Sequence, residues 1–143
     1  MEMLSPYIIA ILLGWIIAQG AKYLIVAAKQ RSFDHIRQLY LSGNMPSSHS
    51  ATVVALVTVV ALKDGIDSGL FAVAALLAGI VMYDAVMVRR SSGEQGVAIQ
   101  QLIKEQKSKV ALPRAAKGHN PLEVLVGALL GAAIGVVVFL ATK

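Results

Sequence analysis

Four runs of apolar residues, separated by shorter polar stretches, set the pattern of the 143-residue chain. A bilayer core is roughly 30 Å thick, so a helix needs about 20 apolar residues to cross it. The second run is shorter than this and must tilt or begin below the membrane surface. The pattern predicts an all-α integral membrane bundle, forming one membrane-embedded domain over residues 1–143. Its predicted transmembrane helices, about four in number, lie at residues 6–28, 48–62, 70–88 and 122–141.

A polar stretch over residues 89–120 separates the third and fourth apolar runs. Within it, apolar residues recur at near-helical spacing among glutamines, glutamates and lysines: Val97, Ile99, Leu102 and Ile103. This spacing predicts an amphipathic helix. We expect the helix either to lie on the membrane interface or to be a solvated connector over one end of the bundle.

Gly127, Gly131 and Gly135 form a stripe of small residues along the last apolar run. Small residues at every fourth position let neighbouring helix backbones approach closely. The stripe therefore predicts helix packing within the membrane. It also offers a face on which two copies of the chain could form a homodimer.

Composition supports a membrane location. Hydrophobic residues make up 57% of the chain and charged residues 15%, with a mean hydropathy of +0.69, which is too apolar for an ordinary soluble domain. Cysteine is absent, so disulfides and Cys-ligated metals are excluded. The first apolar run lacks a preceding basic segment and a following small-residue cleavage site, so we expect a retained helix rather than a signal peptide.

The basic residues are distributed unevenly between the two ends of the predicted bundle. The four spans alternate in direction. One side of the membrane therefore has the end of the first span, the start of the second, the end of the third and the start of the fourth. All 13 Lys and Arg residues except Lys63 and Lys143 fall on that side. Short loops rich in Lys and Arg stay in the cytoplasm. We therefore expect a multi-pass protein of the cell membrane with this end cytoplasmic and both termini external.

The segment GNMPSSHS, residues 43–50, opens the second run and places His49 directly after Ser47 and Ser48. A serine at this position is a common helix N-cap, which would explain the segment without any catalytic role. The same helix end also carries free N–H groups and the positive end of the helix dipole, which together bind anions. The alternative is thus a phosphate cradle of both serines and the adjacent amides, with His49 as a proton donor.

His119 precedes the fourth run in the segment KGHNPLEV, and Glu123 lies four residues farther on. If this turn is helical, the Glu123 carboxylate meets one imidazole nitrogen and leaves the other nitrogen as a nucleophile. The alternative is a surface histidine beside a glutamate that is favoured by the helix N-terminus.

Further basic side chains at the same end are candidates for binding phosphate. Arg89 and Arg90 end the third run, where they could bind phosphate oxygens or serve only as topology markers. Asp84 is placed to pair with one of them and hold it. Lys22, near the end of the first run, could contact the anion or simply extend toward water. His35 lacks such neighbours, and we interpret it as a loop residue.

Taken together, MPSSHSA, VMYDAVMVRR and GHNPLEV resemble the divergent branch of the type 2 phosphatidic acid phosphatase superfamily, over nearly the whole chain. That superfamily includes lipid phosphate phosphatases and vanadium haloperoxidases. Its pattern is K-x6-R-P, then P-S-G-H, then S-R-x5-H-x3-D. Here serine replaces the motif glycine, glutamate replaces the aspartate, and neither K-x6-R-P nor S-R-x5-H is present.

The resemblance implies that His119 is the nucleophile, that Glu123 orients it and that His49 is the histidine of the second motif. It also implies that residues 92–117 are an insertion that splits the third motif. The phosphate-binding residues that it implies are Ser47, Ser48, Arg89 or Arg90, and Lys22 or Lys29 with Arg31 or Arg37.

The activity implied by the resemblance is hydrolysis of a lipid phosphomonoester through a phosphohistidine, with neither a metal nor another cofactor. A cytoplasmic site at the membrane surface favours phosphatidylglycerophosphate as the substrate. Phosphatidylglycerophosphate phosphatase activity is also associated with the divergent branch. Undecaprenyl pyrophosphate, phosphatidic acid and isoprenyl phosphates stay open as substrates. We expect the lipid bilayer and such a phospholipid as partners, and no nucleic acid. A non-catalytic lipid-binding or transport protein is the alternative from another class.

Overall fold

The computed structural model describes residues 4–30, 45–113, 115 and 118–143, and all regular structure within them is helical. The prediction of an all-α membrane bundle is confirmed. A single π-helical turn, η2, joins α3 to α4 without a break. The elements are α1 (Pro6–Gln30), α2 (Ser48–Asp64), α3 (Gly69–Tyr83), η2 (Asp84–Val88), α4 (Arg89–Glu105) and α5 (Pro121–Ala141).

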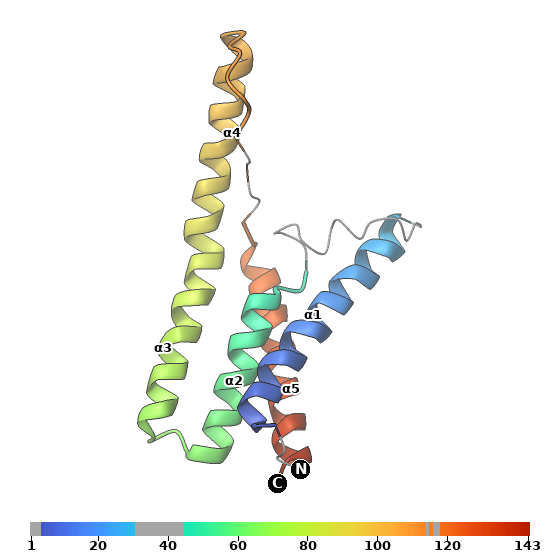
Figure 1. Ribbon diagram of the computed structural model, residues 1–143, viewed down its shortest axis with the longest axis vertical. Coiled ribbons are helices and arrows are strands. Elements are labelled where there is room, and N and C mark those ends of the chain that lie inside the picture. The colour runs from blue at the N-terminus through green and yellow to red at the C-terminus, as the bar shows by residue number, and fades with distance from the viewer. Residues whose placement is uncertain (1–3, 31–44, 114, 116–117) are drawn as a thin grey trace.

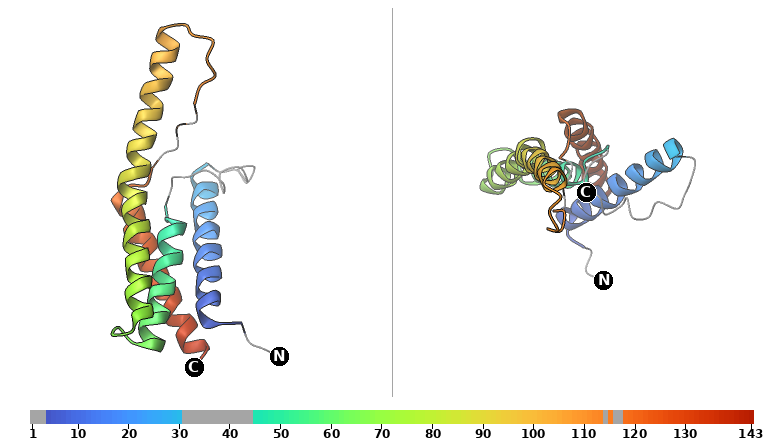
Figure 2. Two further views of the ribbon diagram at one scale, coloured as in Figure 1. Left: turned by 60° about the vertical axis from the view of Figure 1, so that its left-hand side comes forward. Right: turned by 90° about the horizontal axis from the view of Figure 1, so that it is seen from above.

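The helices alternate in direction, so both termini lie at one end of the bundle (Figure 1). Figures 1 and 2 show α2 and α5 in the middle, with α1 on one side and α3 on the other. The central helix α2 packs against α1, α3 and α5. At the end that carries the termini, the Tyr7 hydroxyl donates a 2.7 Å hydrogen bond to Asp64 Oδ2 and so ties α1 to α2.

The predicted glycine stripe brings α5 into close contact with α2. A Cβ atom at Gly127 would overlap the Ser47 carbonyl oxygen, and one at Gly131 would overlap that of Ala51. Gly135 lies against Thr58 in the same way. The prediction of close helix packing is confirmed. Because the stripe is buried within one chain, it does not supply the dimer face that it had suggested.

Within the described residues, three helical segments are long and apolar enough to cross a membrane: residues 6–28 in α1, the continuous helix 69–105, and α5. The remaining helix of the bundle, α2, has 17 residues. At 1.5 Å per residue it is about 25 Å long, which is shorter than the hydrocarbon core. It begins deeper in the bundle than the point where α1 ends, as its short apolar run had suggested (Figure 1).

The predicted amphipathic helix is α4, which continues the line of α3 and extends well beyond the bundle (Figure 1). The sequence had led us to expect a helix that lies on the membrane interface or covers one end of the bundle. The observed helix does neither, because it continues in the direction of α3 (Figure 1). The chain after α4 returns alongside it, and Gln100 Nε2 donates a 2.7 Å hydrogen bond to the Pro113 carbonyl. The return segment crosses α4 where Gly118 lies directly against the Arg90 backbone.

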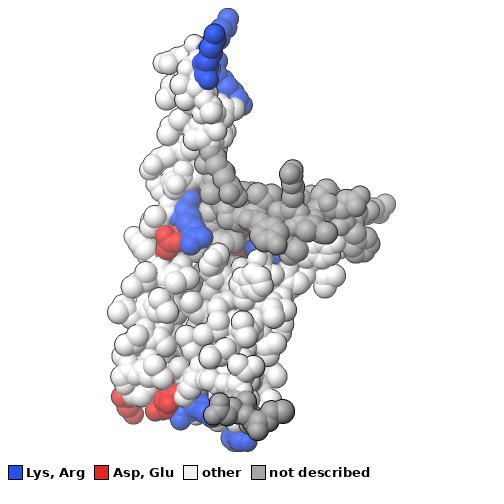
Figure 3. All heavy atoms as spheres, viewed as in Figure 1, with Lys and Arg blue, Asp and Glu red and all other residues white. Residues whose placement is uncertain are grey.

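On the face shown in Figure 3, a broad band between the two ends of the bundle is free of charged side chains among the described residues. We call it the apolar band because large apolar side chains are exposed along the helices that form it. Such a band is what a bilayer core requires of the surface that it covers. Large apolar side chains in the band are exposed on α1, α3 and α5, including Trp15, Leu76 and Leu129. These are the surfaces that lipid chains would cover in this membrane protein.

Candidate functional site

The candidate site lies at the end of the bundle opposite the termini, where α2 and α5 begin. The taller α1 and the continuous α3–α4 helix rise on either side of these two helix starts (Figures 1 and 2). The starts of α2 and α5 therefore lie deeper along the bundle than the end of α1 (Figure 1). The ends of the four segments that alternation had assigned to one side do lie at this end of the bundle (Figure 1).

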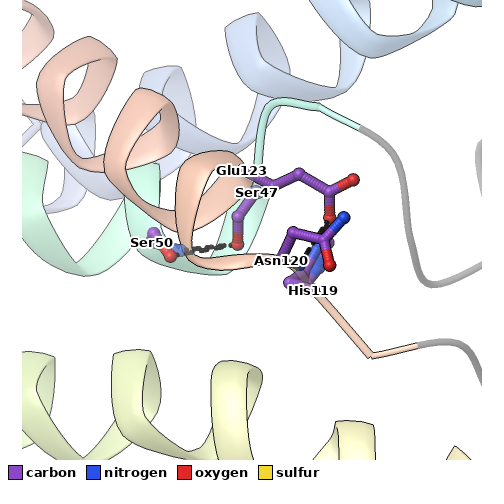
Figure 4. A network of polar contacts seen from close by, with 5 residues as sticks. All are labelled: Ser47, Ser50, His119, Asn120 and Glu123. Atoms are coloured by element: carbon purple, nitrogen blue, oxygen red, sulfur yellow. Dashed lines mark hydrogen bonds and ion pairs between the residues drawn. The ribbon is translucent and has the colours of Figure 1, made fainter.

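His119 is buried, with 3% of its surface exposed, and its ring is held by Glu123. Glu123 Oε2 lies 2.9 Å from His119 Nδ1 and accepts a 3.1 Å hydrogen bond from the Asn120 N–H (Figure 4). Asn120 and Glu123 form a capping box at the start of α5, with Pro121 in the first turn. The helix start thus fixes the carboxylate, which engages Nδ1 and leaves Nε2 of His119 for chemistry.

Ser47 couples the start of α2 to the start of α5. Its N–H donates a 3.1 Å hydrogen bond to the Glu123 carbonyl, and its Oγ accepts bonds from the N–H and hydroxyl of Ser50 (Figure 4). Ser47 is therefore the N-cap of α2, and its own N–H is occupied. The phosphate cradle predicted here has to rely on the amides that follow, since those of Ser48 and His49 have no hydrogen-bond partner among the described residues.

Lys22 is buried in the bundle although it carries a charge. Only 4% of its surface is exposed, and it forms no ion pair with any carboxylate in the described part of the chain. Its charge interacts electrostatically with Glu123 and with His49, which places it on the α1 side of the site. A buried ammonium without a paired carboxylate is costly, and an anion bound beside it would offset that cost.

The two arginines after α3 differ in their partners. Arg89 Nε lies 2.6 Å from Asp84 Oδ2, as predicted for one of this pair. Arg90 instead bonds Glu94 at 3.1 Å, on the wall of a cavity of about 600 Å³ between α4 and the return segment. The charge of Arg89 acts on His49, whereas Arg90 lines the cavity together with Gly118 and Asn120.

His49 is exposed in the first turn of α2. Its ring interacts electrostatically with the charges of Arg89, Lys22 and Asp84 and with the ring of His119. The elements α1, α2, η2 and α4, together with the start of α5 and the residues just before it, thus bring polar groups to one region. An anion between His49 and His119 would be surrounded by positive charge and helix-end amides.

Some predicted residues lie outside the part of the chain that the structure describes. These are Arg31, Arg37 and His35, and the side chain of Lys29. Among the described residues, no three His, Asp or Glu side chains converge in a way that would hold a metal ion.

Two contacts that position His119 and Glu123 were not predicted from the sequence. Asn120 caps α5, and the N-P-x-E spacing of residues 120–123 is a readable capping-box signal. The Ala85 carbonyl accepts a 3.2 Å hydrogen bond from the His119 N–H, and this contact has no sequence signal because it depends on the π-helical turn.

The fold and site define a helical membrane protein with a cluster of polar and charged side chains at one end of its bundle. The chain belongs to the divergent PAP2 family, whose model matches residues 4–134. It is 40% identical to an uncharacterized membrane protein, YuiD, of Bacillus subtilis (strain 168), over 92% of each chain. No solved structure matches this chain. The resemblance stated from the three sequence segments is confirmed at the level of the family.

Proposed function

We propose that the protein is a lipid phosphate phosphatase that hydrolyses a terminal phosphomonoester through a phosphohistidine. The observation that carries the proposal is the pairing of the buried His119 with Glu123, near the buried Lys22, which forms no ion pair within the described residues. A nucleophilic imidazole held by a carboxylate, next to cations and helix-end amides, is suited to phosphoryl transfer. Membership of the divergent PAP2 family agrees with this chemistry.

In the first step, His119 Nε2 attacks phosphorus and the bond from phosphorus to the ester oxygen breaks. His49 donates a proton to the leaving alkoxide, which departs as the lipid alcohol. Glu123 accepts the Nδ1–H throughout, so it stabilises the positive charge that develops on the ring. Lys22, Arg89 and the amides at the start of α2 stabilise the equatorial phosphate oxygens.

In the second step, His49 accepts a proton from water, and the resulting hydroxide attacks the phosphohistidine. The bond between phosphorus and Nε2 breaks, which releases inorganic phosphate and restores His119. Every proton transfer in this cycle is assigned to a residue of the chain. The proposal therefore includes metal independence.

We propose phosphatidylglycerophosphate as the substrate. A site at one end of the membrane-spanning bundle suits a lipid whose phosphate is terminal and whose acyl chains stay in the bilayer. The concentration of Lys and Arg at this end of the protein favours a cytoplasmic location for it. Phosphatidylglycerophosphate carries such a terminal phosphate in the cytoplasmic leaflet.

The test is the release of inorganic phosphate from phosphatidylglycerophosphate by the purified protein in detergent, with EDTA present and His119→Ala as the blank. Release by the wild type alone supports the proposal. If phosphatidic acid or an isoprenyl pyrophosphate is hydrolysed instead, the reaction stands and the substrate assignment is wrong. Binding of these lipids without release from any of them supports a non-catalytic lipid-binding protein. Activity that EDTA abolishes and magnesium restores contradicts metal independence.

A further inference from the structure

The π-helical turn η2 lies between α3 and α4, where a regular α-helix would have continued without interruption. Within it, the Arg89 N–H donates to the Asp84 carbonyl, five residues back. In an α-helix the same N–H would bond the Ala85 carbonyl, four residues back. In the wider turn, the Ala85 carbonyl therefore does not accept the Arg89 N–H that it would accept in an α-helix.

The Ala85 carbonyl accepts the His119 N–H instead, at 3.2 Å. Ala85 is buried, with 2% of its surface exposed, so a carbonyl there without a partner would be costly. His119 is buried as well, with 3% exposed. This hydrogen bond joins two segments that are 34 positions apart in the chain, and it holds the backbone of the proposed nucleophile against η2.

The turn also makes the Asp84–Arg89 ion pair possible. Residues five apart on an α-helix point about 140° away from each other, so their side chains do not meet. In a turn closed by a hydrogen bond from residue i+5 to residue i, the two positions lie above one another. Arg89 Nε then reaches Asp84 Oδ2 at 2.6 Å, and both charges act on His49.

We infer that η2 is a positioning element that assembles the phosphate site from two segments distant in sequence, through the Ala85 carbonyl and the Asp84–Arg89 pair. The inference rests on the proposed function for its catalytic consequence. None of the η2 residues needs to touch the substrate. The turn acts through His119, whose backbone it holds, and through Arg89, whose side chain it directs.

Deleting Met87 separates the two contributions. Met87 is exposed, and its removal lets the turn close as a regular α-helix. The Ala85 carbonyl then bonds Arg90, while Asp84 and Arg89 become four residues apart and can still pair. We expect faster hydrogen exchange at the His119 amide and a kcat about 100-fold lower, the usual effect of displacing a reacting group by about 1 Å. KM should stay within about twofold because the ion pair is kept.

Met87→Ala is the matched control, because it removes the same side chain and keeps the length of the turn. It should preserve both the slow exchange at His119 and kcat. The second variant, Asp84→Asn, keeps the turn and removes the charge that holds Arg89. We expect it to raise KM about 10-fold, in line with the loss of a charged hydrogen bond, and to leave exchange at His119 unchanged.

Amide exchange measured by NMR in detergent tests the docking independently of activity. A His119 amide that exchanges freely in the folded wild type overturns the inference, even if the deletion variant does not fold. Unchanged exchange and unchanged kcat in the deletion variant overturn it as well. Slow exchange that the deletion abolishes, in a protein without turnover on any lipid phosphate, supports the positioning role of η2 and contradicts the proposed function.

Discussion

His119 is held at three points: its ring by Glu123, its N–H by the Ala85 carbonyl, and the residue that follows it by the capping box of α5. A side chain fixed in this way loses little further conformational freedom when a reaction takes place. Such preorganisation is what transition-state stabilisation requires. Replacing Glu123 should therefore lower kcat more than it raises KM.

Replacing Glu123 with glutamine tests this. Glu123→Gln keeps the size of the side chain and removes the charge that stabilises the positive His119 ring. We expect kcat for phosphate release to fall about 100-fold or more, with KM changed far less. Glu105→Gln, at the exposed end of α4, is the control and should match the wild type. Equal kcat in the two variants would show that Glu123 only caps α5.

Lys22 should strengthen binding of the phosphate and should lower the free energy of unfolding of the protein. Lys22→Met fills a similar volume with an apolar chain, so the unfolding temperature in detergent should stay the same or rise. We expect KM to rise about 10-fold or more, because a charged hydrogen bond contributes roughly 1.5–3 kcal/mol. Lys63→Met, exposed at the opposite end, is the control and should change neither quantity. A lower unfolding temperature with unchanged KM would assign Lys22 a structural role.

The sequence identified the side chains of the candidate site better than it identified their partners. Histidine four residues before glutamate is a readable helical pair, and the structure contains it. The choice between Arg89 and Arg90 could not be made, because it depends on an i+5 contact that occurs only in the π-helical turn. The sequence also could not predict that the Ser47 N–H is unavailable to phosphate. That N–H bonds the Glu123 carbonyl, because α5 approaches α2 closely.

At the scale of elements, the stability of the site depends on the contact between α2 and α5. Gly131→Ala places a methyl group against the Ala51 backbone, so the two helices must separate. We expect a loss of about 1–3 kcal/mol in the free energy of unfolding, and reduced activity, since Ser47 and Glu123 join the same two helices. Thermal unfolding in detergent measures the change.

Gly79→Ala is the matched control, since it is also a glycine in a helix, and a Cβ there meets nothing within 4 Å. It should leave stability unchanged or raise it by about 0.5–1 kcal/mol, because alanine restricts the unfolded chain. If both variants behave alike, the helix packing described for the glycine stripe is wrong.

The bounds of the helices could largely be predicted from apolar length and end signals. The long apolar runs, the first-turn proline of α5 and the serines before α2 mark these ends in the sequence. The continuity of α3 with α4 could not be predicted. A drop in hydropathy after Val88 marks the end of a membrane segment, but it carries no information on whether the helix itself ends there.

At the scale of the whole molecule, the two ends of the bundle differ in their content of basic residues. The end with the candidate site carries the basic residues of α4 and its return segment, including Lys104, Lys107 and Lys109, and the opposite end carries the short turn between α2 and α3. The orientation expected from this asymmetry places the site in the cytoplasm. A phosphatase acting on a lipid made in the cytoplasmic leaflet needs that orientation.

Single cysteines test the orientation without background, because the chain has none of its own. Asp67→Cys lies exposed in the turn between α2 and α3, and Gln101→Cys lies exposed on α4. In intact cells, a membrane-impermeant maleimide should label the first variant and not the second. Permeabilised cells should give labelling of both, which shows that each thiol is accessible. The reverse pattern in intact cells would place the site outside and would favour a lipid phosphate presented on the external leaflet.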